Sequence, residues 1–197
     1  MALGSVDQFK ARLTGGGARS NLFQVTMNNP RGGLGVDIDA DLSSFLCEAA
    51  QLPASTVGTI PISFRGRQLK IAGDRTFDVW TVTIINDVNF KLRNAFETWM
   101  NAIANHADIG GTQNPELYFA DLQVTQFDRD ETVKKVYTFK DCWPTDLSAI
   151  DLSYGAEDIE RFSVTWNYQY WTSNTTDGTG AISVSYTHLT LPTTPYV

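Results

Sequence analysis

Cysteine and histidine are scarce in this sequence, and a long apolar run is missing. The chain has two cysteines, Cys47 and Cys142, and two histidines, His106 and His188. Two distant cysteines are too few for a disulfide framework or a zinc site, so we expect free, buried thiols in a reducing, cytoplasmic compartment. No apolar stretch approaches the roughly 20 residues of a membrane span, and the N-terminus lacks the core of a signal sequence. We therefore expect neither bilayer anchoring nor a signal peptide.

The same scarcity argues against an enzyme. A histidine-based triad or metal site has few candidates, and no Ser or Cys lies in a recognisable nucleophile motif. Paired carboxylates stay open in so acidic a chain, but no convergent set of acid, base and nucleophile is evident. Asp74 and Arg75 resemble a catalytic pair, yet their neighbours offer no pocket chemistry, which favours an ion pair at a turn or subunit contact. We expect no catalysis, no metal and no cofactor.

Three loops imitate binding motifs. The first, third, fifth and twelfth positions of a calcium loop are matched by Asp37, Asp39, Asp41 and Glu48. Leu42, however, stands where that loop needs Gly, and we expect a strand rather than a helix to follow. TGGGARS lacks the Lys-Ser/Thr pair of a phosphate loop, and GGLGVDI lacks the third glycine of a dinucleotide fingerprint. We expect one solvated acidic loop and two flexible glycine loops.

Acidic residues outnumber basic residues, 22 to 15. The formal net charge is -7 and the pI is about 4.7. Gripping nucleic acid through its phosphates needs a basic surface, so we do not expect the chain to hold DNA tightly. With 197 residues, 42% of them hydrophobic, the chain has the size of one globular domain with a sizeable core.

The residues that are present predict strands and one good helix. Strands are expected at Asn21–Met27 and Phe45–Pro53, followed by a hairpin at Ile60–Ile71 with its turn at Arg65–Gly66. Alternation places Ile60, Ile62 and Phe64 on one face of that hairpin, with Leu69 and Ile71 on its return strand. Such a hairpin is marginal unless it packs on something else.

The next strand, within Ala72–Asp87, has no plainly polar face. One face carries Phe77, Val79, Thr81, Thr83 and Ile85, and the other carries Asp78, Trp80, Val82 and Ile84. Something must therefore cover each face. Asp87 is expected to cap a helix with a stripe of Val88, Leu92, Ala95, Phe96, Trp99 and Ile103, which can cover one of them.

Further strands are expected at Glu116–Asp128, Thr132–Pro144 and Glu160–Trp171, the first two joined by a charged turn at 129–131. The fold class is therefore mainly β with one α-helix, as an antiparallel sandwich or barrel. We expect residues 1–20 to form a flexible or helical arm, because Leu3, Val6, Phe9 and Leu13 have helical spacing. We expect residues 21–172 to form the domain, and residues 173–197 to form a linker and a non-native tail.

The tail expectation depends on Val184–Thr193, VSYTHLTLPT, which resembles a forward translation of a common transposase sequencing adapter. The Ser/Thr/Gly/Asn run before it is typical of a linker. We expect residues after Ser183 to contribute nothing to folding or assembly. The alternative is a genuine strand, since Val184, Tyr186 and His188 alternate with their neighbours.

An ordered series of motifs carries a family resemblance. NLFQV, the LP after the second strand, IPISFRGRQLKIAGDRTF, WTVTIIND, WPT and FSVTWNYQYW run in order from about residue 20 to 171. Together they resemble the tail tube proteins of contractile-tailed bacteriophages, which are related to type VI secretion tube proteins. The glycine-rich N-terminus, the loop NNPRGGLGVDIDADLSS and everything after Trp171 depart from the pattern.

The resemblance implies a β-sandwich or barrel subunit with a protruding hairpin. It implies six subunits to a ring and rings stacked into the hollow tube of a virion tail, assembled in the host cytoplasm. Implied partners are other copies, sheath, baseplate and tail terminator proteins, and DNA that passes through without specific binding. Neighbouring copies would cover what one subunit leaves exposed. The expected interface residues are Ile60, Ile62, Phe64, Arg65, Arg67, Asp74 and Arg75.

A wall of like charge to phosphate suits a DNA conduit, because it prevents adhesion within a Debye length of about 8 to 10 Å. We take Glu48 as the candidate for the bore, from an alternation in which Leu46 and Ala50 share its face. Two alternatives stay open: a tube of a type VI secretion system or phage-like contractile particle, which exports protein, and a monomeric β-sandwich binding module or hydrolase.

Overall fold

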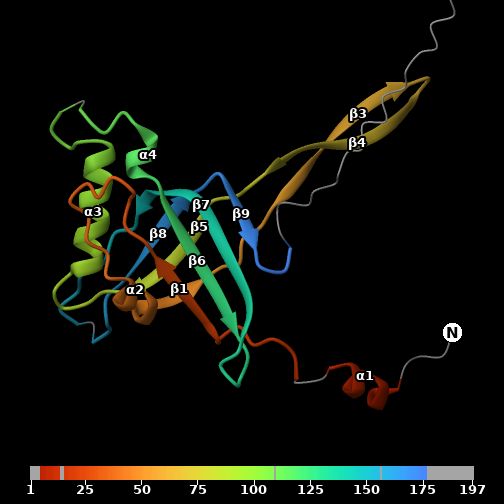
Figure 1. The fold of residues 1–197 in the computed structure, drawn as a ribbon, viewed down its shortest axis with the longest axis horizontal. Helices are drawn as coiled ribbons and strands as arrows, with labels where there is room; N and C mark the ends of the chain where they lie inside the picture. Colours follow the sequence, from red (N-terminus) through yellow and green to blue (C-terminus); the bar gives the residue numbers. More distant parts are fainter. Residues whose placement is uncertain (1–4, 14–15, 109, 156, 177–197) are drawn as a thin grey trace, which may run out of the picture.

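The computed structural model describes residues 5–13, 16–108, 110–155 and 157–176, and Figure 1 shows a β-rich body from which one long hairpin projects. The tail expectation for Val184–Thr193 lies outside these residues. The helices are α1 Val6–Arg12, α2 Ala40–Leu46, α3 Lys91–Ile103 and α4 Pro115–Tyr118. The strands are β1 Phe23–Met27, β2 Cys47–Ala50, β3 Thr56–Phe64, β4 Arg67–Thr76, β5 Trp80–Ile85, β6 Ala120–Phe127, β7 Val133–Leu147, β8 Arg161–Asn167 and β9 Tyr170–Ser173.

The body is one antiparallel sheet of seven strands in the order β1-β6-β7-β8-β5-β2, with β9 paired to β7. The 15-residue β7 joins its two halves, because its first part pairs with β6 and β9 and its last part pairs with β8. A register irregularity with Asp141 at φ +55° bends β7 between these parts. Helix α2 contacts both edge strands, β1 and β2, so the sheet curls into a partly open barrel. The expected fold class is confirmed.

The core lies inside this curved sheet. Trp80, Val82 and Ile84 on β5 are buried and stand opposite Trp166, Val164 and Phe162 on β8. Helix α3 covers the core with its buried stripe Leu92, Ala95, Phe96 and Trp99. The rings of Phe96 and Trp99 meet the Trp166 ring edge-on, with centroids 5.6 and 5.4 Å apart. The expected helix therefore packs on the sheet as predicted.

Strand β5, for which the sequence predicts a cover on both faces, has one buried face and one half-exposed face. Its Trp80, Val82 and Ile84 face turns into the core, whereas Thr81, Thr83 and Ile85 are only half-buried and Val79 is 55% exposed. The chain itself therefore covers one face. That a second copy covers the other stays a prediction.

Several expected boundaries were wrong because local capping outweighs alternation. Phe45 and Leu46 lie in helix α2, where Asp39 accepts hydrogen bonds from the Asp41 and Leu42 N–H groups. The acidic stretch Asp37–Glu48 is thus partly helical, and the strand expected after it is β2, which begins at Cys47 rather than at Phe45. Residues 116–118 lie in α4, which Asn114 caps and Pro115 begins.

Helix α3 begins three residues later than its predicted stripe. Phe90 occupies the N-cap with φ +54°, and Val88 is 95% exposed. Asp87 still accepts a hydrogen bond from the Lys91 N–H at 2.9 Å, so it stabilises the first turn from outside the helix.

The strand expected at Glu160–Trp171 is two strands. After β8 the chain turns at Tyr168–Gln169, where Gln169 donates to the Lys140 carbonyl, and β9 then pairs with a different part of β7. The N-terminal arm was expected to be flexible or helical, and its described part contains helix α1 with a Ser5 capping box.

Candidate assembly surface

The hairpin β3–β4 is exposed along its whole length, and only Gly73 in it is half-buried. Its strands span Thr56–Phe64 and Arg67–Thr76, longer than the predicted Ile60–Ile71. They are joined as predicted by a two-residue turn in which Arg65 and Gly66 have φ +46° and +80°. Positive φ at both central residues matches the right-handed twist of a hairpin, and glycine adopts it without steric cost. Figure 1 shows this arm projecting away from the body.

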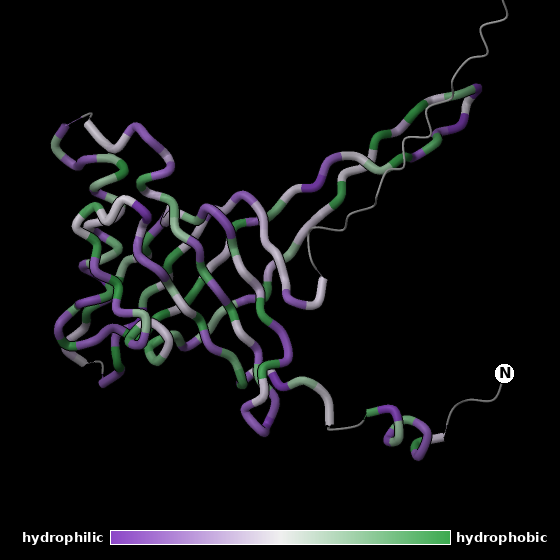
Figure 2. The backbone as a smooth tube through the Cα atoms, in the orientation of Figure 1, coloured by the Kyte–Doolittle hydropathy of each residue, from purple (hydrophilic) through white to green (hydrophobic). Residues whose placement is uncertain are grey.

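One face of the arm is apolar and uncovered. Cross-strand pairing sets Ile60 opposite Ile71 and Ile62 opposite Leu69, and Phe64 follows on the same face. The five side chains are 42 to 67% exposed, with Phe64 the highest. The opposite face carries Thr59, Pro61, Ser63, Gln68, Lys70 and Ala72. Figure 2 shows the apolar stretches along both strands of the arm. A lone two-stranded ribbon is marginal in water, so this apolar face needs a partner.

A bulge fixes the base of the arm. Gly73 and Asp74 together stand opposite Gly58, where the register shifts. A Cβ on Gly73 would lie 3.2 Å from the Gly58 carbonyl carbon, and one on Gly58 would lie 3.3 Å from the Asp74 oxygen. A larger residue at either position would therefore push the two strands apart by a few tenths of an ångström.

Two tryptophans anchor the segment that leads into the arm. The Trp80 indole donates to the Gln51 carbonyl at 2.7 Å, and the Trp171 indole donates to the Ala54 carbonyl at 3.4 Å. These bonds hold the root of the arm on the body.

The arm is basic although the chain is acidic. Arg65, Arg67, Lys70 and Arg75 lie on it with one acidic residue, Asp74, so residues 56–76 carry a net charge of +3 and the rest of the chain -10. The Arg65 guanidinium lies 5.2 Å from the centroid of the Phe64 ring. Within the described residues Asp74 and Arg75 form no ion pair, so the expected internal pair is wrong and only the subunit-contact hypothesis stays open.

Glu48 lies apart from this arm's apolar face, on β2. It is exposed and accepts a hydrogen bond from the Arg161 Nε at 2.6 Å, which partly neutralises its charge. The alternation argument for it was wrong, because Leu46 belongs to α2 and the β2 register shifts between Cys47 and Ala49. Its place in a bore stays a prediction.

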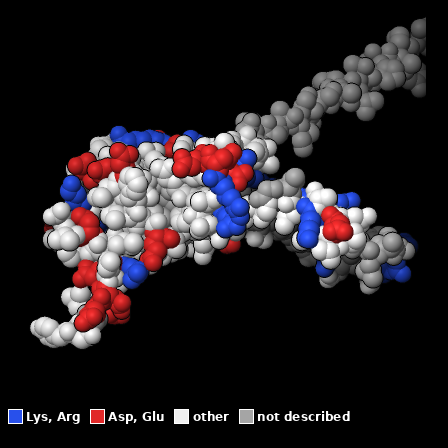
Figure 3. Space-filling view, turned by 90° about the horizontal axis from the view of Figure 1, so that it is seen from below, with Lys and Arg blue, Asp and Glu red and all other residues white. Residues whose placement is uncertain are grey.

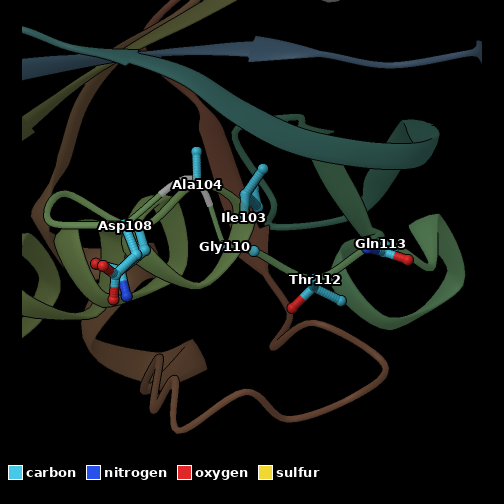
Figure 4. A pocket seen from close by; sticks show the side chains of 8 residues that line it. Ile103, Ala104, Asp108, Gly110, Thr112 and Gln113 are labelled. Atoms are coloured by element: carbon cyan, nitrogen blue, oxygen red, sulfur yellow. The ribbon is translucent and has the colours of Figure 1, made fainter.

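Among the residues that the structure describes, the remaining surface offers little for chemistry. On the face in Figure 3, charged side chains of both signs lie in small groups around a large uncharged area. A pocket of about 380 Å³ lies at the end of α3, but Figure 4 shows Asp108, Thr112 and Gln113 well apart rather than converging. Burial raises the pKa of the Cys47 and Cys142 thiols to about 12, so neither is a thiolate nucleophile at neutral pH. None of the helices in the described ranges is long and apolar enough to cross a bilayer.

Comparison with known proteins gives consistent results. Residues 18–174 match the phage tail tube protein family. The chain is 36% identical over 167 residues to the tail tube protein gp19 of Enterobacteria phage T4, covering 84% of this chain and 97% of the phage protein. It is 28% identical over 158 residues to the tail tube protein of Serratia phage KSP90, covering 79% and 89% of the two chains.

Solved structures share the fold at low identity. A chain in the tube-terminating cap of the anti-feeding prophage aligns with a TM-score of 0.59 at 15% identity, over 88% of this chain and 93% of that one. A chain in the sheath/tube terminator of the extracellular contractile injection system PVC aligns with a TM-score of 0.58 at 12% identity, over 80% and 96%.

Proposed function

Because the chain belongs to the phage tail tube protein family, we propose that it polymerises as stacked hexameric rings into the inner tube of a contractile tail, through which DNA is ejected. The members it matches are structural proteins, and the chain is a tail tube protein rather than an enzyme. Its place is the virion tail, after assembly in the host cytoplasm.

The observation that carries the proposal is the apolar face of the β3–β4 arm. Ile60, Ile62 and Phe64 are 49, 46 and 67% exposed, and the body of the same chain leaves them uncovered. A ring or stack of identical subunits supplies a partner surface for every arm at once, with the same contact repeated at each copy.

The charge distribution supports a conduit with the arm outside the bore. A basic wall would retain phosphates, and residues 56–76 carry a net charge of +3. The acidic remainder of the chain repels them instead. We therefore place the apolar face of the arm, together with Arg65 and Arg67, in subunit contacts, and acidic or neutral side chains on the bore.

The outer partners are sheath, baseplate and tail terminator proteins. An inner tube of a contractile tail must meet a sheath along its length and other proteins at its two ends. Related folds occur in a baseplate and in sheath/tube terminator assemblies of contractile particles, which is consistent with these partners.

Among the alternatives, a phage tail is favoured over a protein-exporting tube. The relatives at 36 and 28% identity over most of the chain are both phage tail tube proteins. A monomeric binding module is disfavoured by the uncovered apolar arm, because large exposed apolar faces on a monomer invite aggregation.

Sedimentation of the purified chain tests self-assembly. Above a threshold concentration the chain is expected to appear in a fast-sedimenting fraction, with the monomer concentration in the supernatant staying constant. A chain that remains a monomer at all attainable concentrations would rule out unaided polymerisation.

Glu48 gives a test of the bore. We expect tubes of the Glu48→Lys variant, assembled with short duplex DNA at low salt, to retain the DNA. In such tubes each subunit would place one positive charge on the wall of the bore, and these charges attract phosphate. Glu48→Gln is the matched control, since both changes remove the ion pair to Arg161 but only one adds positive charge. Co-sedimentation of labelled DNA is the measurement. If Glu48→Lys tubes retain none, Glu48 does not face the bore.

A further inference from the structure

Helix α1 presents an apolar stripe to solvent. Val6, Phe9 and Leu13 follow one another at helical spacing and are 69, 65 and 45% exposed. No residue of this helix is buried, and Figure 1 shows it apart from the body. A helix of 7 residues is shorter than the 12 to 15 or so at which isolated helices become marginally stable in water, so packing against a partner is needed to hold it.

The body has a groove that no described segment fills. It encloses about 680 Å³ between the start of β1, the end of α2 and the β6–β7 turn. Its apolar lining includes Leu22, Phe23, Phe45 and Phe127, of which Phe45 is 85% exposed. An aromatic side chain so open to water on a folded body marks a surface that another apolar element can cover.

The charges at the two surfaces are complementary. At 100° per residue, Lys10 and Arg12 flank the apolar stripe of α1 on its two sides. The turn Asp128–Glu131 at the rim of the groove has three carboxylates and one guanidinium. Asp128 is paired with Lys134 at 3.0 Å, whereas Asp130 and Glu131 form no ion pair within the described part of the chain. An apolar stripe with basic flanks therefore meets an apolar groove with an acidic rim.

The segment that connects α1 to β1 runs along the edge of the chain's own groove. The Phe127 N–H donates to the Leu22 carbonyl at 2.9 Å, and the Gln126 side chain donates to the Arg19 carbonyl at 3.4 Å. These bonds hold residues 19–22 along the end of β6, and α1 lies beyond them, away from its own groove. Within the described ranges of a single copy, both surfaces stay uncovered.

We propose that α1 of one copy docks in the groove between β1, α2 and the β6–β7 turn of a neighbouring copy. This interaction rests on the proposed self-assembly and adds a second contact to that of the arm. It ties neighbouring copies together through the N-terminal segment.

The first test compares two substitutions on opposite sides of α1. Phe9→Asp is expected to raise the threshold concentration for tube formation at least about tenfold, because it puts a charge on the face that enters the groove. Ala11→Asp adds the same charge on the far face and is expected to leave the threshold unchanged. Phe45→Asp, on the groove side, should act like Phe9→Asp. Circular dichroism checks folding, which the helix variants should not alter since α1 buries nothing in the monomer.

The second test separates a neighbour's groove from the chain's own. A Phe9→Cys chain mixed with a Phe45→Cys chain is expected to give a dimer with a short bis-maleimide linker, whereas wild type provides the background from Cys47 and Cys142. A chain that carries both Phe9→Cys and Phe45→Cys, diluted so that copies rarely meet, tests the alternative. If this chain cross-links internally and the mixed single-cysteine chains give no dimer, α1 docks in its own groove and the proposal is overturned. Normal tubes from Phe9→Asp would overturn the docking alone, whereas a wild type that never forms tubes would overturn the proposed function and this contact with it.

Discussion

Replacing Ile62 and Phe64 together with Asp is expected to abolish tube formation and leave a folded subunit. Both side chains lie on the apolar face of the arm and are already 46 and 67% exposed, so the monomer loses little buried apolar area. In the assembly each Asp would bring an unpaired charge into a desolvated contact, which is strongly unfavourable. Electron microscopy and circular dichroism are the two measurements.

A double substitution on the other face provides the matched control. Thr59→Asp with Ser63→Asp adds the same charge to the same strand, on the side that carries Lys70 and Gln68. This control is expected to assemble at a concentration near that of wild type. Tubes of normal length from the Ile62→Asp/Phe64→Asp chain would show that the arm is not an assembly element.

The second large effect is expected on stability rather than assembly. Trp99→Ala should lower the free energy of unfolding by about 3 to 5 kcal/mol, the usual cost of removing a large buried aromatic side chain. Trp99 is fully buried, packs edge-on against Trp166, and donates its indole N–H to the Tyr118 carbonyl at 3.0 Å. The substitution leaves a cavity and an unpaired carbonyl between α3, α4 and β8.

Urea unfolding of the monomer measures this loss. Thr98→Ala, one residue away on the exposed side of α3, is the control and should change the free energy of unfolding by less than about 0.5 kcal/mol. A loss below about 1 kcal/mol for Trp99→Ala would contradict the packing of α3 on the sheet.

Long, regular patterns in the sequence predicted their elements well. Strict alternation at Ile60, Ile62 and Phe64, with Gly66 at the turn, is enough to predict a hairpin and its apolar face. The stripe of Leu92, Phe96 and Trp99 predicts α3 in the same way, because 3.6-residue spacing over about two turns fits no strand.

Short elements could not be predicted this way, because a few local contacts decide them. Asp39 caps the start of α2, so Phe45 and Leu46 are helical although their pattern predicts a strand. Asn114 likewise caps the start of α4 within a segment predicted as a strand. The bulge at Gly58 and Gly73 breaks the alternation of apolar and polar residues at the base of the arm. The sequence pattern therefore predicted a hairpin shorter than the one observed.

The candidate site was predictable only where composition and alternation agree. The apolar arm satisfies both, so its residues were identified from sequence. Glu48 depended on alternation across a strand boundary that lies elsewhere, and its pairing with Arg161 joins residues more than a hundred positions apart. The groove beside Phe45 is likewise formed by three separate segments, and no local pattern signals it.

Negative-stain electron microscopy of the purified wild-type chain tests self-assembly most directly. We predict hollow tubes, or short stacks whose end views show six-fold rings, formed without any other protein. Dispersed monomers at concentrations where tail tubes assemble, or rings of another symmetry, would contradict the proposal that the chain builds a hexameric tube by itself.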